Sequence, residues 1–516
     1  MTTPERSLPS LLDSAAAAPA PFLTVGGRTC GGREFRGLAM RAASRLRDLG
    51  FRRGDRLCLH LHRCLEESIE FFAVWLCGGI AVPINPKLKD AQVAHVLRDS
   101  EPFGVVTSAV KATLLRDPEK VFAGTRVFSP EDILGAGPAA PDGSDGAFSP
   151  CDERPGDPAV ILYTSGSSGP SKGVVQSRRN LAAGARIVAS YLGLSPKDHV
   201  LALLPFSFDY GLNQLLSAMH AGCRVTAADY LGAADLGRVL ADARPTGLAG
   251  VPSLWHDLCR GLETGALDGS CLATLRWLTN SGGRLALPDI RRLRRAIPRA
   301  RIFSMYGLTE AFRSAFLDPA EIDRRPDSFG KAIEGVELLL VDPATGSVLE
   351  GEGTGELVHA GALVASGYWR NERETRLRFR PDPRGGGSTV VYSGDLVRRD
   401  REGFLYFVSR MDRMMKVHGH RVSPDEVLEG VRGFPGVEEA AVVSVPGGSS
   451  GDRIILFVAG PAASGIEDRL MRHCRSELPG YMVPWEIRVK PELPRNANGK
   501  VDLDSLRGEA QCTGPC

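Results

Sequence analysis

The sequence predicts an α/β protein with a large N-terminal domain of mixed sheets and helices and a small α+β C-terminal domain. Three observations support this class. The chain has 516 residues, enough for two to four domains at about 100–200 residues each. Hydrophobic residues are 43% and charged residues 24% of the chain, which is typical of a globular protein. Helical and strand patterns alternate along most of the chain, and the last hundred residues follow a different pattern.

The N-terminal part begins with alternating helical and strand patterns. Residues 35–49 carry apolar side chains at helical spacing and are followed by Gly50. Residues 56–62 alternate as a strand does, 91–98 fit a short helix, and 104–107 fit a short buried strand. This alternation favours an architecture that contains parallel sheet.

Composition places the domain boundaries. Residues 135–157 are rich in Gly, Pro, Ala, Ser and Asp, as in a surface loop or internal linker. The α/β pattern then resumes, which predicts a large domain over 1–408 and a small domain over 414–516, with the boundary between them at 409–413; the hinge expected there rests on the family resemblance given below. The small domain is expected to contain strands at 439–445 and 453–458 and a helix at 466–478.

Charge and hydropathy exclude several function classes. The net charge is +2, without the basic field of a nucleic-acid-binding protein. The longest apolar stretch, residues 71–84, is shorter than the roughly 18 residues that span a bilayer. The start has no signal-peptide pattern, and the eleven cysteines form no CxxC pair. We therefore expect a reduced, cytoplasmic protein with no nucleic-acid or membrane partner.

The strongest chemical signal is residues 159–175, AVILYTSGSSGPSKGVV. An apolar, β-rich run leads into a loop of glycines and hydroxyl residues with one lysine, Lys172. Such a loop presents backbone N–H groups and hydroxyls to an anion. It is not a Walker A loop. That motif ends in Gly-Lys followed by Ser or Thr, whereas here Lys172 is followed by Gly173. The pattern predicts a phosphate-binding loop.

This loop resembles that of the adenylate-forming superfamily, which contains acyl-CoA synthetases, nonribosomal peptide synthetase adenylation domains and luciferases. Further similar motifs follow in the family's order: YGLTE at 306–310, GEL and GYW within 356–369, YSGDL at 392–396, SRMDRMMKVHGHR at 409–421 and NGKVD at 498–502. The resemblance covers roughly residues 20–505. It implies that a carboxylate attacks the α-phosphorus of ATP, with Mg²⁺ present, to give an acyl-AMP.

The resemblance also implies roles for individual residues. Catalytic roles fall on Lys500, Glu310, Thr164 and Lys172, with Glu310 as the Mg²⁺ ligand. The residues expected to bind ATP or AMP are Thr164, Ser165, Gly166, Ser167, Ser168, Gly169, Lys172, Gly282, Gly283, Tyr306, Gly307, Thr309, Asp395 and Arg410. Tyr306 would offer a flat face to adenine, Asp395 would accept the ribose hydroxyls, and Lys500 would bridge the substrate carboxylate and the phosphate.

The family pattern further implies two alternating active sites. Asp412 matches the hinge, about which the small domain rotates after adenylation. The rotation withdraws Lys500 and brings the Gly419 segment beside a tunnel for a phosphopantetheine thiol. Two departures from the family pattern stand near these positions: Ser393 where threonine is usual, and Ser409 where glycine is usual.

Residues 203–216, LLPFSFDYGLNQLL, indicate which acid is activated. Phe208 stands where many CoA ligases have histidine. Asp209 stands where peptide-synthetase domains have an aspartate that binds the substrate ammonium; alternatively, it is a structural hydrogen-bonding residue beside Tyr210. Arg313 could meet a second carboxylate or be a plain surface arginine. The positions that match the pocket are Asp209, Asn213, Ser253, Ser281, Met305 and Arg313.

This short, polar lining favours a small polar or amino acid over a long acyl chain. The chain ends soon after Lys500, so we expect that any carrier protein is supplied in trans, and the leading hypothesis is transfer to such a stand-alone carrier protein. An acyl- or aryl-CoA synthetase that uses free CoA is the nearest alternative. Nothing in the sequence specifically favours a luciferase-like oxygenase, and the matches at Lys172, Glu310 and Lys500 disfavour a non-catalytic relative.

Overall fold

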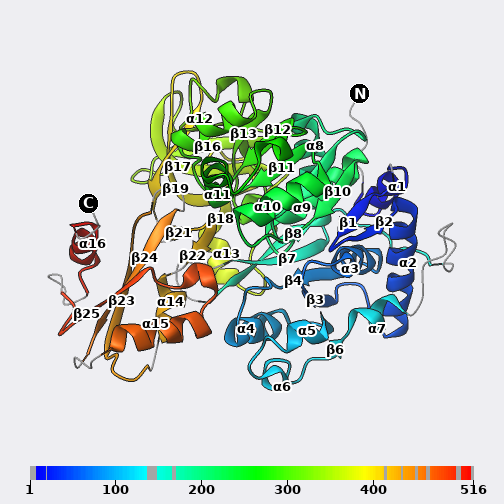
Figure 1. The fold of residues 1–516 in the computed structure, drawn as a ribbon, viewed down its shortest axis with the longest axis horizontal. Coiled ribbons are helices and arrows are strands. Elements are labelled where there is room, and N and C mark those ends of the chain that lie inside the picture. The colour runs from blue at the N-terminus through cyan, green and yellow to red at the C-terminus, as the bar shows by residue number, and fades with distance from the viewer. Residues whose placement is uncertain are drawn as a thin grey trace.

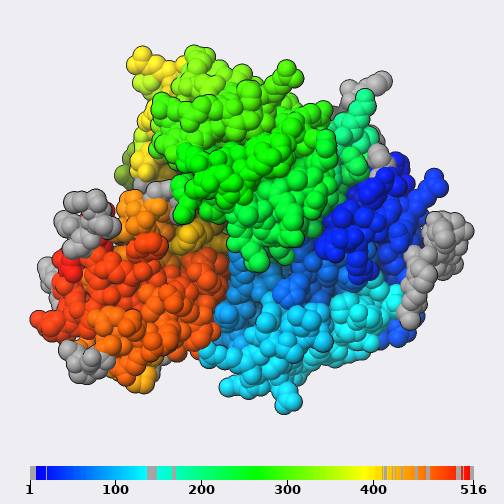
Figure 2. Space-filling model, viewed as in Figure 1, coloured from blue at the N-terminus to red at the C-terminus, as the bar shows by residue number. Residues whose placement is uncertain are grey.

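The computed structural model describes residues 7–18, 20–135, 148–164, 170–411, 415–422, 424–431, 434–447, 451–460, 465–494 and 501–512. They form a large N-terminal part with two sheets and a smaller C-terminal lobe, which agrees with the predicted class. In Figure 2 the C-terminal lobe, in orange and red, lies against both the blue and the green segments of the N-terminal part.

The first sheet has six strands, parallel except for the last pair. Their order is β6 (Val127–Phe128), β5 (Gly104–Thr107), β3 (Arg56–His60), β4 (Ile80–Pro83), β7 (Pro158–Thr164) and β8 (Lys172–Ser177). Four strands or helices expected between residues 35 and 108 are present within a few residues of their expected bounds.

The second sheet joins a parallel part to an antiparallel part. Strands β1, β10, β9, β11, β12 and β13 run parallel to one another, and the other pairings are antiparallel. In order the strands are β16 (Val336–Val341), β17 (Gly353–Gly361), β19 (Thr389–Arg399), β20 (Leu405–Arg410), β15 (Ser328–Ala332), β14 (Ala315–Leu317), β13 (Arg301–Tyr306), β12 (Trp277–Asn280), β11 (Gly247–Gly250), β9 (His199–Ala202), β10 (Arg224–Ala227), β1 (Leu23–Val25) and β2 (Arg28–Cys30), with β18 (Phe379–Pro381) paired to β19.

Helices fill the space between the sheets and cover their outer faces. The inner core contains side chains of α1 (Ser10–Ala16), α2 (Gly32–Asp48), α3 (Leu65–Leu76), α7 (Pro130–Leu134), α8 (Arg178–Leu192) and α9 (Asp209–Ala221). The other face of the first sheet is covered by α4 (Asp90–Ser100), α5 (Ala109–Ala112) and α6 (Pro118–Val121). The other face of the parallel strands is covered by α10 (Ala233–Ala243), α11 (Pro252–Thr264) and α12 (Leu287–Ala296). None of the helices in the described part of the chain combines the length and apolar character needed to cross a membrane.

Helix α2 illustrates why these segments form amphipathic helices. Phe35, Leu38, Ala42 and Leu46 recur every three or four residues and are all buried, so one face of the helix packs on the core. The dense basic run at 291–301 is partly the solvent side of α12, where Arg292 pairs with Glu263 while apolar positions face the core.

The C-terminal lobe is a small α+β unit. A three-stranded sheet is formed by β23 (Glu439–Pro446), β24 (Asp452–Ala459) and β25 (Glu486–Lys490), and packs against α14 (Pro424–Val431), α15 (Ile466–Glu477) and α16 (Leu503–Cys512). A separate hairpin, β21 (Met415–Val417) and β22 (His420–Val422), precedes them.

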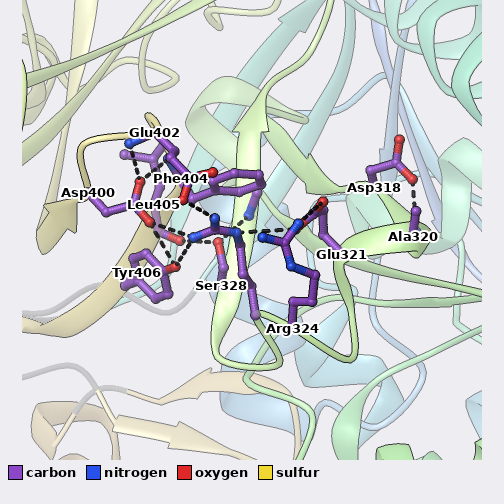
Figure 3. Close-up of polar contacts among 12 residues, drawn as sticks. Asp318, Ala320, Glu321, Arg324, Ser328, Asp400, Glu402, Phe404, Leu405 and Tyr406 are labelled. Carbon is purple, nitrogen blue, oxygen red and sulfur yellow. Dashed lines mark hydrogen bonds and ion pairs between the residues drawn. The ribbon is translucent and has the colours of Figure 1, made fainter.

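An ionic cluster supports the strand that leads toward this lobe. Arg325 pairs with Glu321, Asp400 and Glu402, and its Nη1 lies 3.3 Å from the Tyr406 hydroxyl oxygen. Figure 3 shows that these carboxylates converge from the segment before β15 and from the turn between β19 and β20. Because several charges share one partly buried arginine, the cluster holds the turn before β20 against the segment before β15.

Candidate active site

An open cleft of about 1260 Å³ lies between the N-terminal part and the C-terminal lobe. Thr164 at the end of β7, Ser281 and Gly282 after β12, and Gly307 and Thr309 after β13 all line it. Each of these residues follows or ends a strand at its carboxyl end, which is where α/β sheets place their ligand sites. The topology therefore brings most of the predicted nucleotide-binding residues that the structure describes into one region.

Asp395 and Tyr306 form the best-defined polar pair of this region. Asp395 lines the cleft, is buried, and accepts a hydrogen bond from the Tyr306 hydroxyl. The Tyr306 ring stacks on Phe329 with 4.5 Å between ring centroids, and on His359. The ring is itself buried and is not among the residues that line the cleft, so in this conformation Tyr306 contacts the cleft region through Asp395.

Glu310 and Lys172 lie close together but have protein partners. The Tyr368 hydroxyl donates to Glu310 Oε1 at 2.7 Å in a buried setting. Lys172 pairs with Glu374 of α13 (Glu372–Arg378), and its Nζ lies 5.7 Å from the centroid of the Tyr368 ring. Neither Tyr368 nor Glu374 was identified from the sequence as a site residue, although Tyr368 belongs to the GYW motif.

A single carboxylate such as Glu310 is chemically suited to Mg²⁺. Magnesium is usually held by one or two carboxylates together with substrate phosphates, and Glu310 follows Thr309, which lines the cleft, although the Glu310 side chain is itself buried and bonded to Tyr368. Among the described residues, no group of three His, Cys, Asp or Glu side chains could hold an ion by itself.

Several predicted residues lie outside the described part. These are Ser165–Gly169 of the loop, Asp412 of the hinge and Lys500. For Arg410 the structure gives the backbone alone: it ends β20 and is the register partner of Asp395 on β19.

The turn of the β21–β22 hairpin closes one side of the cleft. Gly419 has a φ of 78°, and a Cβ added there would lie 2.9 Å from Val251 Cβ. A Cβ added to Gly282 would in turn lie 3.3 Å from the Gly419 carbonyl oxygen. His420, Tyr481 and other residues of the lobe also line the cleft, and burial lowers the pKa of His420 to about 3. Glycine at 419 thus permits a close contact between the two parts.

A smaller cavity of about 320 Å³ lies beside the cleft. Asn213, Met305 and Arg313 line it, together with Tyr210 and Thr279, whose side-chain oxygens are 2.6 Å apart. Ser281 lines the large cleft instead, and Ser253, at the start of α11, lines neither space.

Asp209 and Arg313 form a buried ion pair. Arg313 Nη1 lies 3.1 Å from Asp209 Oδ2, and each side chain is 4% exposed. Arg313 is therefore not a surface arginine. Asp209 is the first residue of α9, where the helix dipole favours a negative charge. Burial nevertheless raises the pKa of Asp209, and the Arg313 charge opposes this rise.

Two neighbouring residues have structural roles that explain their identity. A Cβ on Gly211 would lie 2.0 Å from the Pro205 carbonyl oxygen, so the first turn of α9 can approach this loop only with glycine. Arg178 is buried and donates to the Trp75 carbonyl at 3.0 Å, which ties α8 to α3.

Comparison with known proteins identifies the family. The model of the AMP-binding enzyme family matches residues 13–369, and that of the AMP-binding enzyme C-terminal domain matches residues 429–500. The chain belongs to the AMP-binding enzyme family. The resemblance to the adenylate-forming superfamily is thereby confirmed, and the protein is an AMP-forming ligase.

Curated members of the AMP-binding family span almost the whole chain. An L-proline–[L-prolyl-carrier protein] ligase of Streptomyces coelicolor is 31% identical over 494 residues, which are 92% of this chain and 91% of that protein. A long-chain-fatty-acid–CoA ligase of Escherichia coli O157:H7 is 29% identical and covers 90% of this chain and 87% of that protein.

Solved structures of family members share the fold. A malonyl-CoA ligase bound to methylmalonyl-CoA and AMP has 27% identity and a TM-score of 0.81, over 95% of this chain and all of that one. The o-succinylbenzoate CoA synthetase of Bacillus subtilis has 24% identity and a TM-score of 0.83, over 98% of each chain. The predicted fold class is thus confirmed over nearly the full length.

Proposed function

We propose that this ligase adenylates a small polar carboxylic acid or amino acid with ATP and then transfers the acyl group to the phosphopantetheine thiol of a stand-alone carrier protein. The observation that best supports the proposal is a cleft at the carboxyl ends of both sheets, closed by the Gly419 turn. The chain is also similar over 92% of its length to a ligase that acts on a carrier protein.

In the first half-reaction, a substrate carboxylate oxygen bonds to the α-phosphorus of ATP while the bond to pyrophosphate breaks. Lys172, Thr164 and the loop 165–169 would bind the phosphates, and Asp395 and Arg410 would bind the ribose. Mg²⁺ bound at Glu310 would supply Lewis-acid stabilisation of the phosphate charge. Lys172 can move from Glu374 to the nucleotide because an anionic phosphate offers an equivalent partner.

In the second half-reaction, the thiol sulfur bonds to the acyl carbon, AMP leaves, and the thiol proton passes to solvent. The Gly419 turn would form one wall of the path by which the pantetheine arm enters. We propose that the lobe rotates about the Asp412 segment between the two half-reactions, so that Lys500 serves the first and Gly419 the second.

The first test is a product assay. With ATP, Mg²⁺ and a panel of amino and non-amino acids, we expect AMP and pyrophosphate, together with acid-dependent ATP–pyrophosphate exchange. Release of ADP and orthophosphate with every acid would contradict the adenylation chemistry.

The second test separates the two half-reactions. We expect Lys500→Ala to lower acyl-AMP formation at least about 100-fold, because it removes a cation from a reaction that develops negative charge. Thioester formation from preformed acyl-AMP should persist. Single-turnover measurements of each half-reaction check this, and equal loss of both would refute the division of roles.

The alternative acceptor is free CoA, as the similarity to a fatty-acid–CoA ligase allows. A phosphopantetheinylated carrier protein encoded by a neighbouring gene and free CoA should be compared at equal concentration. We expect carrier loading to dominate; thioester formation with CoA alone would favour the CoA synthetase.

A further inference from the structure

Arg313 is a charged group placed in the wall between the two cavities. It lines both the large cleft and the smaller cavity. Among the described residues that line the smaller cavity, Arg313 alone carries a charge, whereas Asp209 lines only the cleft. The other lining residues are neutral, so Arg313 is the group in this wall that could attract an anion, although Asp209 already offsets part of its charge.

One edge of the Arg313 guanidinium has protein partners, and the other edge is buried without one among the described residues. Nη1 donates to Asp209 Oδ2 at 3.1 Å and to the Phe312 carbonyl at 2.8 Å. Nε and Nη2 are buried and have no hydrogen-bond partner among the described residues. These two nitrogens lie on the same edge of a guanidinium, and their parallel N–H groups match the two oxygens of a carboxylate.

The surrounding residues hold that edge in place. The guanidinium carbon lies 4.6 Å from the centroid of the Tyr210 ring, a stacked arrangement that restricts its rotation. The residue before Arg313, Phe312, has a φ of 48°. Its ring packs against Gly184, where an added Cβ would lie 2.4 Å from Phe312 Cε1. Strained backbone of this kind often lies at ligand-binding positions.

We propose, on the basis of the function proposed above, that this ligase activates a short dicarboxylic acid and that Arg313 binds the second carboxylate through Nε and Nη2. The reacting carboxyl would remain in the cleft, near Ser281 and Gly307, which line it together with Arg313. The smaller cavity as it stands has room for about one water molecule, so a second carboxylate would enter it only with movement of the side chains around Arg313, and a long acyl chain does not fit. Asp209 is then a positioning residue, which holds Nη1 and leaves the opposite edge for the substrate.

The charge of Asp209 is compatible with a second carboxylate. Burial raises the pKa of Asp209, so the protonated form of Asp209 becomes more accessible when another carboxylate approaches the shared arginine. An ammonium-bearing acid would instead have to displace Arg313 from Asp209 or share the carboxylate with a cation.

The decisive experiment compares matched acids on the wild-type protein. Malonic, succinic and glutaric acids are each compared with their monomethyl ester and with the amino acid of equal chain length that carries an ammonium in place of the second carboxyl. The readouts are kcat/KM in ATP–pyrophosphate exchange and the dissociation constant from calorimetry. At least one diacid should exceed its ester by about 10- to 100-fold, the range of a hydrogen bond to a charged group.

Variants assign that preference to Arg313. In Arg313→Gln the diacid-to-ester ratio should fall toward one, and Arg313→Lys, which keeps the charge without the two-pronged edge, should give an intermediate ratio. Arg186→Gln is the matched control: Arg186 also pairs with a carboxylate, Glu334 at 2.9 Å, but lines neither cavity. It should keep the wild-type ratio.

The inference is overturned if every diacid is within about threefold of its ester, or if the ammonium-bearing acids are preferred. These results would leave the proposed function intact as long as some acid supports exchange. Absence of exchange and of AMP with all acids would overturn the proposed function instead, and the calorimetric diacid-to-ester comparison would still decide whether Arg313 binds a carboxylate.

Discussion

At the scale of single residues, His359 on β17, beside the expected nucleotide site, should make the stability of the protein depend on pH. It is fully buried, stacks on Tyr306, and neither ring nitrogen has a hydrogen-bond partner among the described residues. Burial lowers its pKa from 6.5 to about 4. Between about pH 6.5 and 4, His359 therefore stays neutral in the folded state while the unfolded chain takes up a proton at this residue. Proton uptake favours the unfolded chain, so the stability present above about pH 6.5 is progressively lost as the pH falls toward 4.

We expect His359→Phe to flatten the pH dependence of stability. A single such group contributes a slope of up to about 1.4 kcal/mol per pH unit, and phenylalanine keeps a ring against Tyr306 without a titrating nitrogen. Thermal unfolding of wild type and variant between about pH 7 and 5 measures the difference. His62→Phe serves as a comparison: burial also lowers the pKa of His62, which is more exposed, so this variant should lose a smaller part of the wild-type slope. An unchanged slope in His359→Phe would contradict this account.

At the scale of elements, the β21–β22 hairpin depends on glycine at its turn. A side chain at Gly419 would meet Val251, and its φ of 78° is unfavourable for other residues. We expect Gly419→Leu to lower thioester formation at least about 10-fold, because the turn could no longer approach Gly282. Acyl-AMP formation should fall much less, which is the reverse of the pattern expected for Lys500→Ala. Equal losses in both half-reactions would indicate general misfolding of the hairpin.

At the scale of the whole molecule, two side-chain contacts join the described part of the C-terminal lobe to residues between 92 and 116. Arg116 pairs with Glu477 of α15, and Gln92 Nε2 of α4 lies 3.8 Å from Met482 Sδ. Figure 1 shows α15 beside α4. The Arg116 side chain is 58% exposed, and an exposed pair contributes about 0–1 kcal/mol. Contacts this weak are compatible with the lobe rotation that we propose.

Arg116→Ala should therefore change the ratio of the two half-reaction rates by no more than about fivefold, the equivalent of 1 kcal/mol. The melting temperature should be nearly unchanged. Arg238→Ala is the control, because the Arg238–Asp235 pair lies within α10 and does not join the two parts. A larger shift in the ratio would mean that this ion pair governs the orientation of the lobe.

Local patterns predicted much of the fold and part of the site. Regular spacing identified α2, β3 and β5, and ordered motifs identified Asp395 and Gly419, because such signals are contained in short segments. Ser253 matched the pocket in sequence but lines neither cavity. Glu374 and Tyr368 were missed as partners of Lys172 and Glu310, since no local pattern relates residues so distant along the chain.

By itself, the sequence determined the family, the α/β class and the adenylating chemistry of this protein, because those properties depend on motifs whose residues are adjacent in the chain. Tertiary structure alone decided what Asp209 meets. Arg313 lies 104 residues away, and only the packing of α9 against the segment after β13 joins the two charges and leaves one guanidinium edge without a protein partner among the described residues. Our proposal on the substrate rests on that meeting of distant segments, since the energy of a buried charge is set by its neighbours in space.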